Sequence, residues 1–357
     1  WTGATIQKLA GIVEEVGSSV SSVSVGDEVC GLCSLTSRNG ACAEYTVQSE
    51  HALVVKPKLV LHDDAAMAIG PGIFGLTALH YNLKVERGTS ILICDAASPE
   101  GYVLIQLAAE LGLRIFATAR SQAQVSFLEV LGDTVARIID EVQENLADVI
   151  MEETNRMGVD YIVETLRYTP TLPSSTAEST TVPKNPVRDT VPETGEPPPS
   201  ITNTSKPKNP STGTGNPFTA SAPPAPSSAP PASAGVLSTE DDEIVLLRLR
   251  RKRLLIQSLA THGRWATLSN DMQLDPDEAR IMGLKNASLS WIFPQAWVVC
   301  PSKQGHFLHI MDSVMKHLSE GKFRPLPCTT FDLAQIRDAH RQLENTLQYV
   351  GRVVIKM

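Results

Sequence analysis

A short polar stretch, Asp95-Ala-Ala-Ser-Pro-Glu-Gly101, joins a continuous apolar run to a segment with helical periodicity. Such a turn binds the phosphates of a dinucleotide when glycines let backbone N–H groups approach the anion and the following helix points its positive end at it. Here Gly101 is the only glycine, Glu100 adds negative charge and Pro99 lacks an N–H. Ser98 can cap the helix or donate to a phosphate. The stretch predicts either a weakened phosphate-binding turn or a turn that binds nothing.

Arg120 follows a second apolar run, at residues 114–118. In nucleotide-binding α/β folds, an acid in this region accepts a hydrogen bond from a ribose hydroxyl, whereas an arginine can pair with a 2′-phosphate. Arg120 is therefore a candidate for selecting a phosphorylated nucleotide. The alternative is a solvated arginine at the start of a helix, and the sequence leaves both interpretations open.

Cys30 and Cys33 have the spacing of one half of a zinc knuckle, and Cys42 lies nearby. No second pair completes a four-ligand set, because His51 and His62 are isolated in the sequence. We therefore predict no metal site and interpret these cysteines as buried strand residues. The scattered cysteines also indicate reduced thiols and a cytoplasmic location.

Residues 247–254 contain five basic side chains. Such a cluster can serve nuclear import or bind a polyanion, but its place between helical and strand-like segments favours the solvated end of a helix. The sequence has no Gly-x-Ser-x-Gly elbow, no HExxH motif, and no credible Ser/His/Asp or Cys/His set. Hydrolytic chemistry therefore has no support.

The elements that would position these residues alternate between strands and helices. Strands are expected at 90–94, 114–118, 137–139, 159–163, 254–260 and 287–293, and helices at 102–111, 121–131, 143–155 and 306–318. A helix at 333–343 and a strand at 350–356 end the chain. This order predicts right-handed βαβ units and an α/β fold with a Rossmann-type, doubly wound parallel sheet.

The first 60 residues show a different pattern. Short β-branched runs at 9–16, 20–25 and 44–47 end at turn-forming residues, which predicts a small, mostly antiparallel β module. Helical patterns then begin at Asp63 and Asp64, which are suited to cap the first turn.

The prolines are unevenly distributed, since 16 of the 24 fall at residues 169–238. These 70 residues also hold 23 serines and threonines, four acids and four bases, with few large apolar side chains. Such a segment cannot bury enough apolar surface to offset the entropy of ordering it, so we predict a disordered insertion at 169–238. The remaining 287 residues suffice for one large core or two domains.

The net charge of −8 argues against nucleic acid or anionic membrane as a partner. No apolar run approaches the roughly 20 residues of a membrane helix. The chain starts without the basic and apolar regions of a signal peptide, and the missing initiator methionine indicates an incomplete N-terminus.

Several motifs occur in a recognisable order: residues 11–20 (Gly-Ile-Val-x-x-Val-Gly-x-x-Val), 25–29 (Val-Gly-Asp-Glu-Val), 40–45 (Gly-Ala-Cys-Ala-Glu-Tyr), 75–78 (Gly-Leu-Thr-Ala), 105–108 (Ile-Gln-Leu-Ala) and 350–354 (Val-Gly-Arg-Val-Val). Together they resemble the medium-chain dehydrogenase/reductase superfamily, in its zinc-independent quinone oxidoreductase (zeta-crystallin) branch. The resemblance covers nearly the whole chain outside 169–238.

The resemblance implies a GroES-like, mostly β catalytic domain that is truncated at its start. This domain would comprise 1–75 and 326–357, and the Rossmann domain 76–168 and 239–325. The implied activity is hydride transfer from NADP(H) to a quinone or an activated alkene, as in enoyl reductases, without a metal. It also implies a homodimer, for which the apolar residues 287–293 can supply an edge.

The cofactor-binding positions carried over from the family are Thr77 at the domain junction, Ala97, Ser98 and Gly101 in the turn, Thr118 and Arg120 after the second strand, and His262, Gly263 and Arg264 after the fifth. No catalytic residue is assigned. Because the turn keeps one glycine, the alternative is a catalytically degenerate Rossmann scaffold that acts as a binding or regulatory protein.

Overall fold

The computed structural model describes residues 8–33, 40–165, 239–270, 272–344 and 350–357. The chain divides into one unit formed by 1–170 and 243–357 and another formed by 171–242. The description below concerns the first unit and helix α5, which starts at Thr239. The insertion predicted at 169–238 lies outside the described residues.

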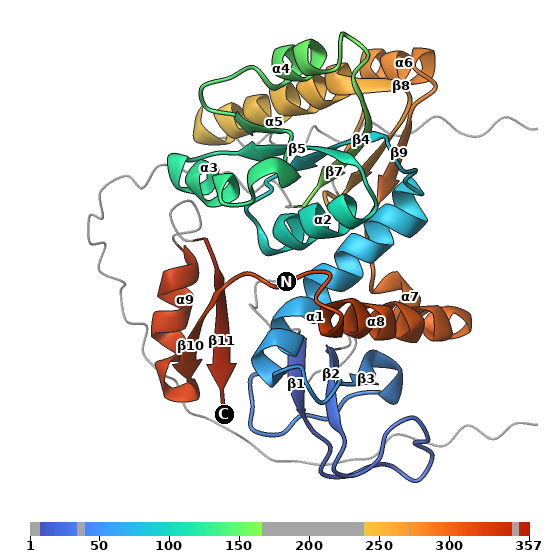
Figure 1. Ribbon diagram of the computed structural model, residues 1–357, viewed down its shortest axis with the longest axis vertical. Coiled ribbons are helices and arrows are strands. Elements are labelled where there is room, and N and C mark those ends of the chain that lie inside the picture. The colour runs from blue at the N-terminus through green and yellow to red at the C-terminus, as the bar shows by residue number, and fades with distance from the viewer. Residues whose placement is uncertain (1–7, 34–39, 166–238, 271, 345–349) are drawn as a thin grey trace, which may run out of the picture. The chain divides into compact units, whose positions relative to one another are not determined.

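A parallel sheet of six strands is the framework of the first unit (Figure 1). In sheet order the strands are β6 (Arg137–Asp140), β5 (Arg114–Ala119), β4 (Ser90–Cys94), β7 (Val159–Glu164), β8 (Leu259–Thr267) and β9 (Ser288–Trp291). The chain order reverses between β4 and β7. This is the predicted Rossmann-type sheet, and such sheets bind ligands at the carboxyl ends of the strands beside this reversal.

Helices cover both faces of the sheet (Figure 1). One face packs on α2 (Pro99–Glu110) and α3 (Gln122–Glu129), and the other on α4 (Leu146–Glu153), α5 (Thr239–Ser258) and α6 (Pro276–Leu284). Side chains alternate along β4, so that Ile91 and Ile93 join the first core and Leu92 and Cys94 the second. This two-sided burial explains why the strand reads as a continuous apolar run.

The predicted antiparallel module is a three-stranded sheet of β1 (Lys8–Ile12), β2 (Glu28–Leu32) and β3 (Leu53–Val55). The runs at 20–25 and 44–47 form no strand. A separate parallel pair joins β10 (Cys328–Asp332) to β11 (Arg352–Lys356).

Helix α1 (His62–Leu76) connects the small sheet to the Rossmann part, since it contacts β1, β2, α2 and α8 (Gln304–Ser319). It continues as the π-helical segment η2 (Thr77–Leu83). The remaining helices are η1 (Glu50–Ala52), η3 (Gly132–Thr134), α7 (Ala296–Val299), η4 (Pro301–Lys303), η5 (Leu333–Gln335) and α9 (Ile336–Glu344). No helix among the described residues has the length and apolar character needed to cross a bilayer.

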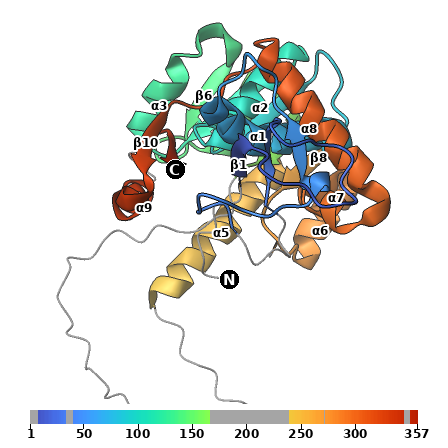
Figure 2. The same ribbon diagram turned by 90° about the horizontal axis from the view of Figure 1, so that it is seen from below.

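The strand predicted at 254–260 is wrong, because α5 continues to Ser258 and β8 begins only at Leu259. Lys252, Leu255 and Ile256 are buried, at the spacing of three and four residues that one helix face requires. The Lys252 Nζ lies 2.5 Å from Glu278 Oε2 of α6, which fixes this end of α5 against its neighbour. Viewed from below, α6 lies beside the carboxyl-terminal end of α5 (Figure 2).

Candidate functional site

The turn between β4 and α2 begins at Asp95, whose φ of 54° lies in the left-handed region. Asparagine and aspartate tolerate this conformation, but dinucleotide-binding turns place glycine at the corresponding tight bend. Thr118 of β5 supports the turn, because its hydroxyl accepts from the Asp95 N–H at 3.0 Å and its carbonyl accepts from the Ala96 N–H at 3.0 Å. Thr118, a predicted site residue, therefore shapes the turn from the neighbouring strand.

Ser98 caps α2 and links it across the point where the strand order reverses. Its hydroxyl accepts from the Gly101 N–H at 3.0 Å and lies 2.8 Å from the hydroxyl of Thr165, at the end of β7. Thr165 in turn donates to the Cys94 carbonyl at 2.8 Å. Sequence reasoning missed Thr165, because a single threonine beside the proline-rich tract carries no signal.

Gly101 allows the start of α2 to approach the turn closely. A Cβ atom at this position would lie 2.7 Å from both the Cα and the carbonyl oxygen of Ala96, which is closer than real Cβ contacts. Only glycine fits, as at the third glycine of dinucleotide-binding turns, where the helix packs closely on the strand. Ala97, also predicted for the site, is buried beside them.

Arg120 lies over the turn and forms an ion pair with Asp95, the first residue of the turn. Its Nε is 2.6 Å from Asp95 Oδ1, yet neither atom makes a well-aligned hydrogen bond within the described part of the chain. The second Asp95 oxygen is 3.0 Å from a guanidinium nitrogen of Arg251, which is also 3.1 Å from Glu141 Oε1. Asp95 is only 4% exposed, so one buried carboxylate is shared by two arginines.

Arg251 balances a group of buried acids at the carboxyl ends of the strands. Burial disfavours its charged form, but Asp95 and Glu141 outweigh this effect and raise the pKa of Arg251. Burial raises the pKa of Glu141 and of Glu164, and Arg251 only partly opposes the rise. Glu164 also accepts a hydrogen bond of 2.7 Å from the Thr267 hydroxyl of β8.

We expect the substitution Glu164→Gln to stabilise the protein at pH 7 by about 1 kcal/mol. Because the pKa of Glu164 is raised in the fold, its contribution is fully favourable below its unfolded pKa and is lost as pH rises through the folded pKa. Glutamine imitates the neutral acid and can keep the Thr267 hydrogen bond. Urea unfolding between pH 4 and pH 7 should show a gain that grows with pH. The same gain in Glu153→Gln, at the surface ion pair with Arg114, would contradict this explanation.

Glu100, in the first turn of α2, faces the strands β1 and β11. Its carboxylate lies 3.4 Å from the Nζ of Lys8 in β1, and Arg352 of β11 is close enough to act on it. Burial favours the neutral form of Glu100, but these two cations outweigh it and hold its pKa below the usual range. Lys8 reaches this carboxylate by crossing α1 at Gly70, where a Cβ would meet the lysine stem.

Thr77 starts η2 and is 3% exposed. Its hydroxyl makes no hydrogen bond to any residue that the structure describes. Because an unpaired buried hydroxyl is costly, Thr77 remains a candidate for contact with a bound ligand.

His262, Gly263 and Arg264 lie inside β8, and the prediction that they follow the strand is wrong. Arg264 pairs in register with Tyr161, three residues before the end of β7, and its guanidinium donates to the Leu83 carbonyl. These residues lie toward the amino ends of the strands, apart from the turn at Gly101. The error follows from the misplaced start of β8.

Cys30 is a buried residue of strand β2, as predicted, but Cys33 is buried just after that strand and Cys42 is half-buried and in no strand, so the prediction is wrong for these two. Burial raises the pKa of Cys30 to about 12 and also raises that of Cys33. Cys30 Sγ lies 3.3 Å from Met315 Sδ of α8. Among the residues that the structure describes, no three His, Cys, Asp or Glu side chains are grouped to hold a metal ion.

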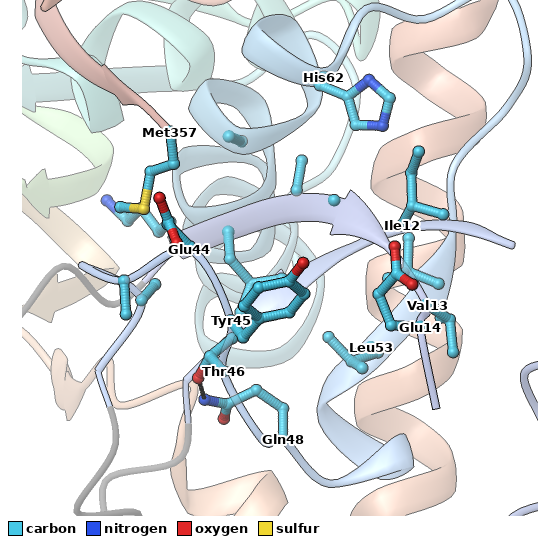
Figure 3. A pocket seen from close by; sticks show the side chains of 18 of the residues that line it. Ile12, Val13, Glu14, Glu44, Tyr45, Thr46, Gln48, Leu53, His62 and Met357 are labelled. Atoms are coloured by element: carbon cyan, nitrogen blue, oxygen red, sulfur yellow. Dashed lines mark hydrogen bonds between the residues drawn. The ribbon is translucent and has the colours of Figure 1, made fainter. Parts of the chain in front are cut away.

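A groove of about 1370 Å³ lies between β1, β11 and residues 41–48. Figure 3 shows the Tyr45 ring within it, with Glu44 and Met357 to one side and Ile12 and Val13 to the other. Lys8 and Arg352, the two cations beside Glu100, also line the groove. These two side chains connect the groove with Glu100, although none of the lining residues comes from α2 itself.

Comparison with known proteins agrees with this fold. The zinc-binding dehydrogenase family matches residues 245–355. Quinone oxidoreductase-like protein 1 of Mus musculus is 29% identical over 324 residues, which cover 90% of this chain and 73% of that protein.

Two solved structures share the fold. An alcohol dehydrogenase superfamily protein from Novosphingobium aromaticivorans gives a TM-score of 0.67 at 19% identity, over 98% of this chain and 81% of that chain. The JamJ enoyl reductase, in its apo form, gives 0.67 at 18% identity, over 98% and 78%. Over most of its length the chain is thus similar to a quinone oxidoreductase-like protein, and its fold is that of the solved alcohol dehydrogenase superfamily and enoyl reductase structures.

Proposed function

We propose that the protein is an NAD(P)H-dependent oxidoreductase that transfers hydride to a quinone or an activated alkene without zinc. The observation that carries the proposal is the close approach of Gly101 to the Ala96 backbone, beside the reversal of strand order. This approach puts the positive end of α2 at the place where α/β folds bind a pyrophosphate. The names of the mouse relative and of the enoyl reductase structure support the reaction class.

Different described residues would contact different parts of such a cofactor. The start of α2 at Ser98 and Gly101 would face the pyrophosphate, and Arg120 is placed for a phosphate on the adenosine ribose. The buried hydroxyl of Thr77 offers a free donor and acceptor. The nicotinamide would supply the hydride, while the chain positions it and excludes water.

The groove beside Lys8 is suited to the acceptor. Its walls carry apolar side chains from β1 and β11, and its volume of about 1370 Å³ exceeds that of common ligand sites. A flat or extended apolar molecule would bury its surface there, and Lys8 or Arg352 could stabilise negative charge that develops on its oxygen.

Isothermal titration of the full-length protein with NADPH and with NADH tests the proposal. Binding of either cofactor in the micromolar to low millimolar range is expected. If neither binds at millimolar concentration, the proposed function is wrong.

The substitution Thr77→Val should separate a ligand-binding role from a packing role. Valine has nearly the same shape without the unpaired hydroxyl, so we expect about 1 kcal/mol more stability without cofactor and about tenfold weaker NADPH binding. Thermal unfolding and titration measure the two effects. Thr154→Val is the control, because its hydroxyl donates to Ile150 and accepts from Gly158, and its loss should destabilise the fold. Unchanged NADPH affinity in Thr77→Val would remove Thr77 from the site.

The alternative is a Rossmann scaffold without catalysis. The specific observation that favours it is the pair of acids, Asp95 and Glu100, at the turn where a cofactor would bring negative charge. A full-length protein that binds neither cofactor, and still fails to do so after Ser98 and Pro99 are replaced by glycine, would support this alternative. Turnover of a quinone by the native protein would exclude it.

A further inference from the structure

We propose that Asp95 and Glu100 are specificity-determining residues that compete with the phosphates of a dinucleotide for the cations of the site. The inference rests on the proposed function, because it assumes that this turn takes a dinucleotide. It goes further by assigning one phosphate position to each acid, and by predicting that the native chain gains little from the 2′-phosphate of NADPH.

Asp95 competes for Arg120. The Arg120 Nε lies 2.6 Å from Asp95 Oδ1, so the side chain placed for a 2′-phosphate already faces a full negative charge. The pair is close but poorly aligned, since neither atom has a well-formed hydrogen bond within the described residues. The contact is an ion pair without a well-aligned hydrogen bond, and a phosphate with better geometry would have to displace the carboxylate first.

Glu100 competes at the other end of the turn. It stands in the first turn of α2, where its carboxylate accepts from its own backbone N–H and pairs with Lys8 at 3.4 Å. The helix start and two cations are the groups that would attract a pyrophosphate. The Glu100 carboxylate lies among these groups and offsets their positive charge. An incoming anion is therefore attracted less strongly.

The two acids act on different phosphates, and their effects can therefore be measured separately. 2′,5′-ADP and 5′-AMP differ only in the 2′-phosphate, which Arg120 would bind. Both carry the 5′-phosphate, which would lie near α2. A change at Asp95 should alter the ratio of the two affinities, whereas a change at Glu100 should alter both affinities together.

The experiment measures dissociation constants of 2′,5′-ADP and 5′-AMP by titration calorimetry for the full chain. Asp95→Asn keeps a residue that tolerates positive φ and should raise the affinity for 2′,5′-ADP about tenfold, with 5′-AMP changed less than about twofold. Glu100→Gln should raise both affinities by the same factor, about fivefold. Glu110→Gln is the matched control on α2, where it breaks the 2.9 Å pair with Lys322 and the 4.0 Å pair with His317, and neither affinity should change.

A double-mutant cycle with Arg120→Gln tests the assignment at Asp95. Alone, Arg120→Gln should cost less than about twofold in 2′,5′-ADP affinity, but in the Asp95→Asn background it should remove the tenfold gain. A large loss in the native background, or an equal gain for both probes in Asp95→Asn, overturns the competition at Asp95. If Asp95→Asn does not fold, the single variants Arg120→Gln and Glu100→Gln test the inference. If a cofactor binds but none of the expected affinity changes is seen, this inference is wrong and the proposed function is unaffected. If neither the probes nor a cofactor binds, both are wrong.

Discussion

Replacing Arg251 with methionine is expected to lower the free energy of unfolding at pH 7 by about 3–5 kcal/mol, the usual effect of removing one partner from a buried ionic cluster. The Arg251 side chain is 11% exposed and contacts Asp95 and Glu141, while Glu164 lies close enough for charge interaction. Without the guanidinium these acids would remain buried, and Arg120, at 2.6 Å from Asp95, would be a counter-charge for that acid alone. Methionine fills a similar volume, so the loss would report charge more than packing.

The pH dependence of this loss identifies its cause. Burial already raises the pKa of Glu141 and Glu164, and removal of Arg251 would raise both further. An acid with a raised folded pKa stabilises the fold below its unfolded pKa and destabilises it as pH rises through the folded value. The deficit of Arg251→Met should therefore shrink toward pH 4. Urea unfolding from pH 4 to pH 8 measures it, with the exposed Arg250→Met on the same helix as control. A deficit that is independent of pH would assign the effect to packing.

The sheet could be predicted because its strands are buried on both faces. In β4 and β5 every second side chain enters one core and the others enter the opposite core, which produces the uninterrupted apolar runs. The helix α2 was equally clear, since Val103, Leu104, Leu107 and Ala108 repeat at helical spacing. Where the side chains of a strand are exposed or only half-buried, as at β10, no such run exists and the element was missed.

Residues 254–260 show the limit of this reasoning. An apolar run of this length fits a buried strand or a buried helix segment equally well. The helix is decided by contacts distant in sequence, chiefly the pairing of Lys252 with Glu278. The basic cluster was misread for the same reason, since Arg251 and Lys252 enter ion pairs inside the fold while Arg250 is exposed.

Part of the site was predictable from local sequence. Ser98, Gly101, Thr118 and Arg120 meet around one turn, because each follows or borders the carboxyl end of β4 or β5. The ionic partners were not predictable, because Arg251 comes from α5 and Lys8 from β1. No local spacing relates these residues to Asp95 or Glu100, so only the tertiary fold shows that both acids are already paired.

Gly101→Ala should have the second large effect, a loss of about 2 kcal/mol in the free energy of unfolding and at least tenfold in cofactor affinity. The new Cβ would lie 2.7 Å from the Ala96 Cα and carbonyl oxygen. These are backbone atoms that cannot rotate away, so the start of α2 must move from the turn. The Ser98 cap and the 2.8 Å link to Thr165 would be strained together.

Gly283→Ala in α6 is the matched control for this substitution. Its added Cβ meets no atom within 4 Å, so the higher helix propensity of alanine should stabilise the protein by about 0.5–1 kcal/mol. Urea unfolding and NADPH titration of both variants give the comparison. Opposite signs in stability, with weaker binding only in Gly101→Ala, are expected if the close approach of helix and turn builds the phosphate site. If Gly101→Ala loses stability but binds NADPH as the native chain does, the glycine serves helix packing alone, and the cofactor lies elsewhere than at the start of α2.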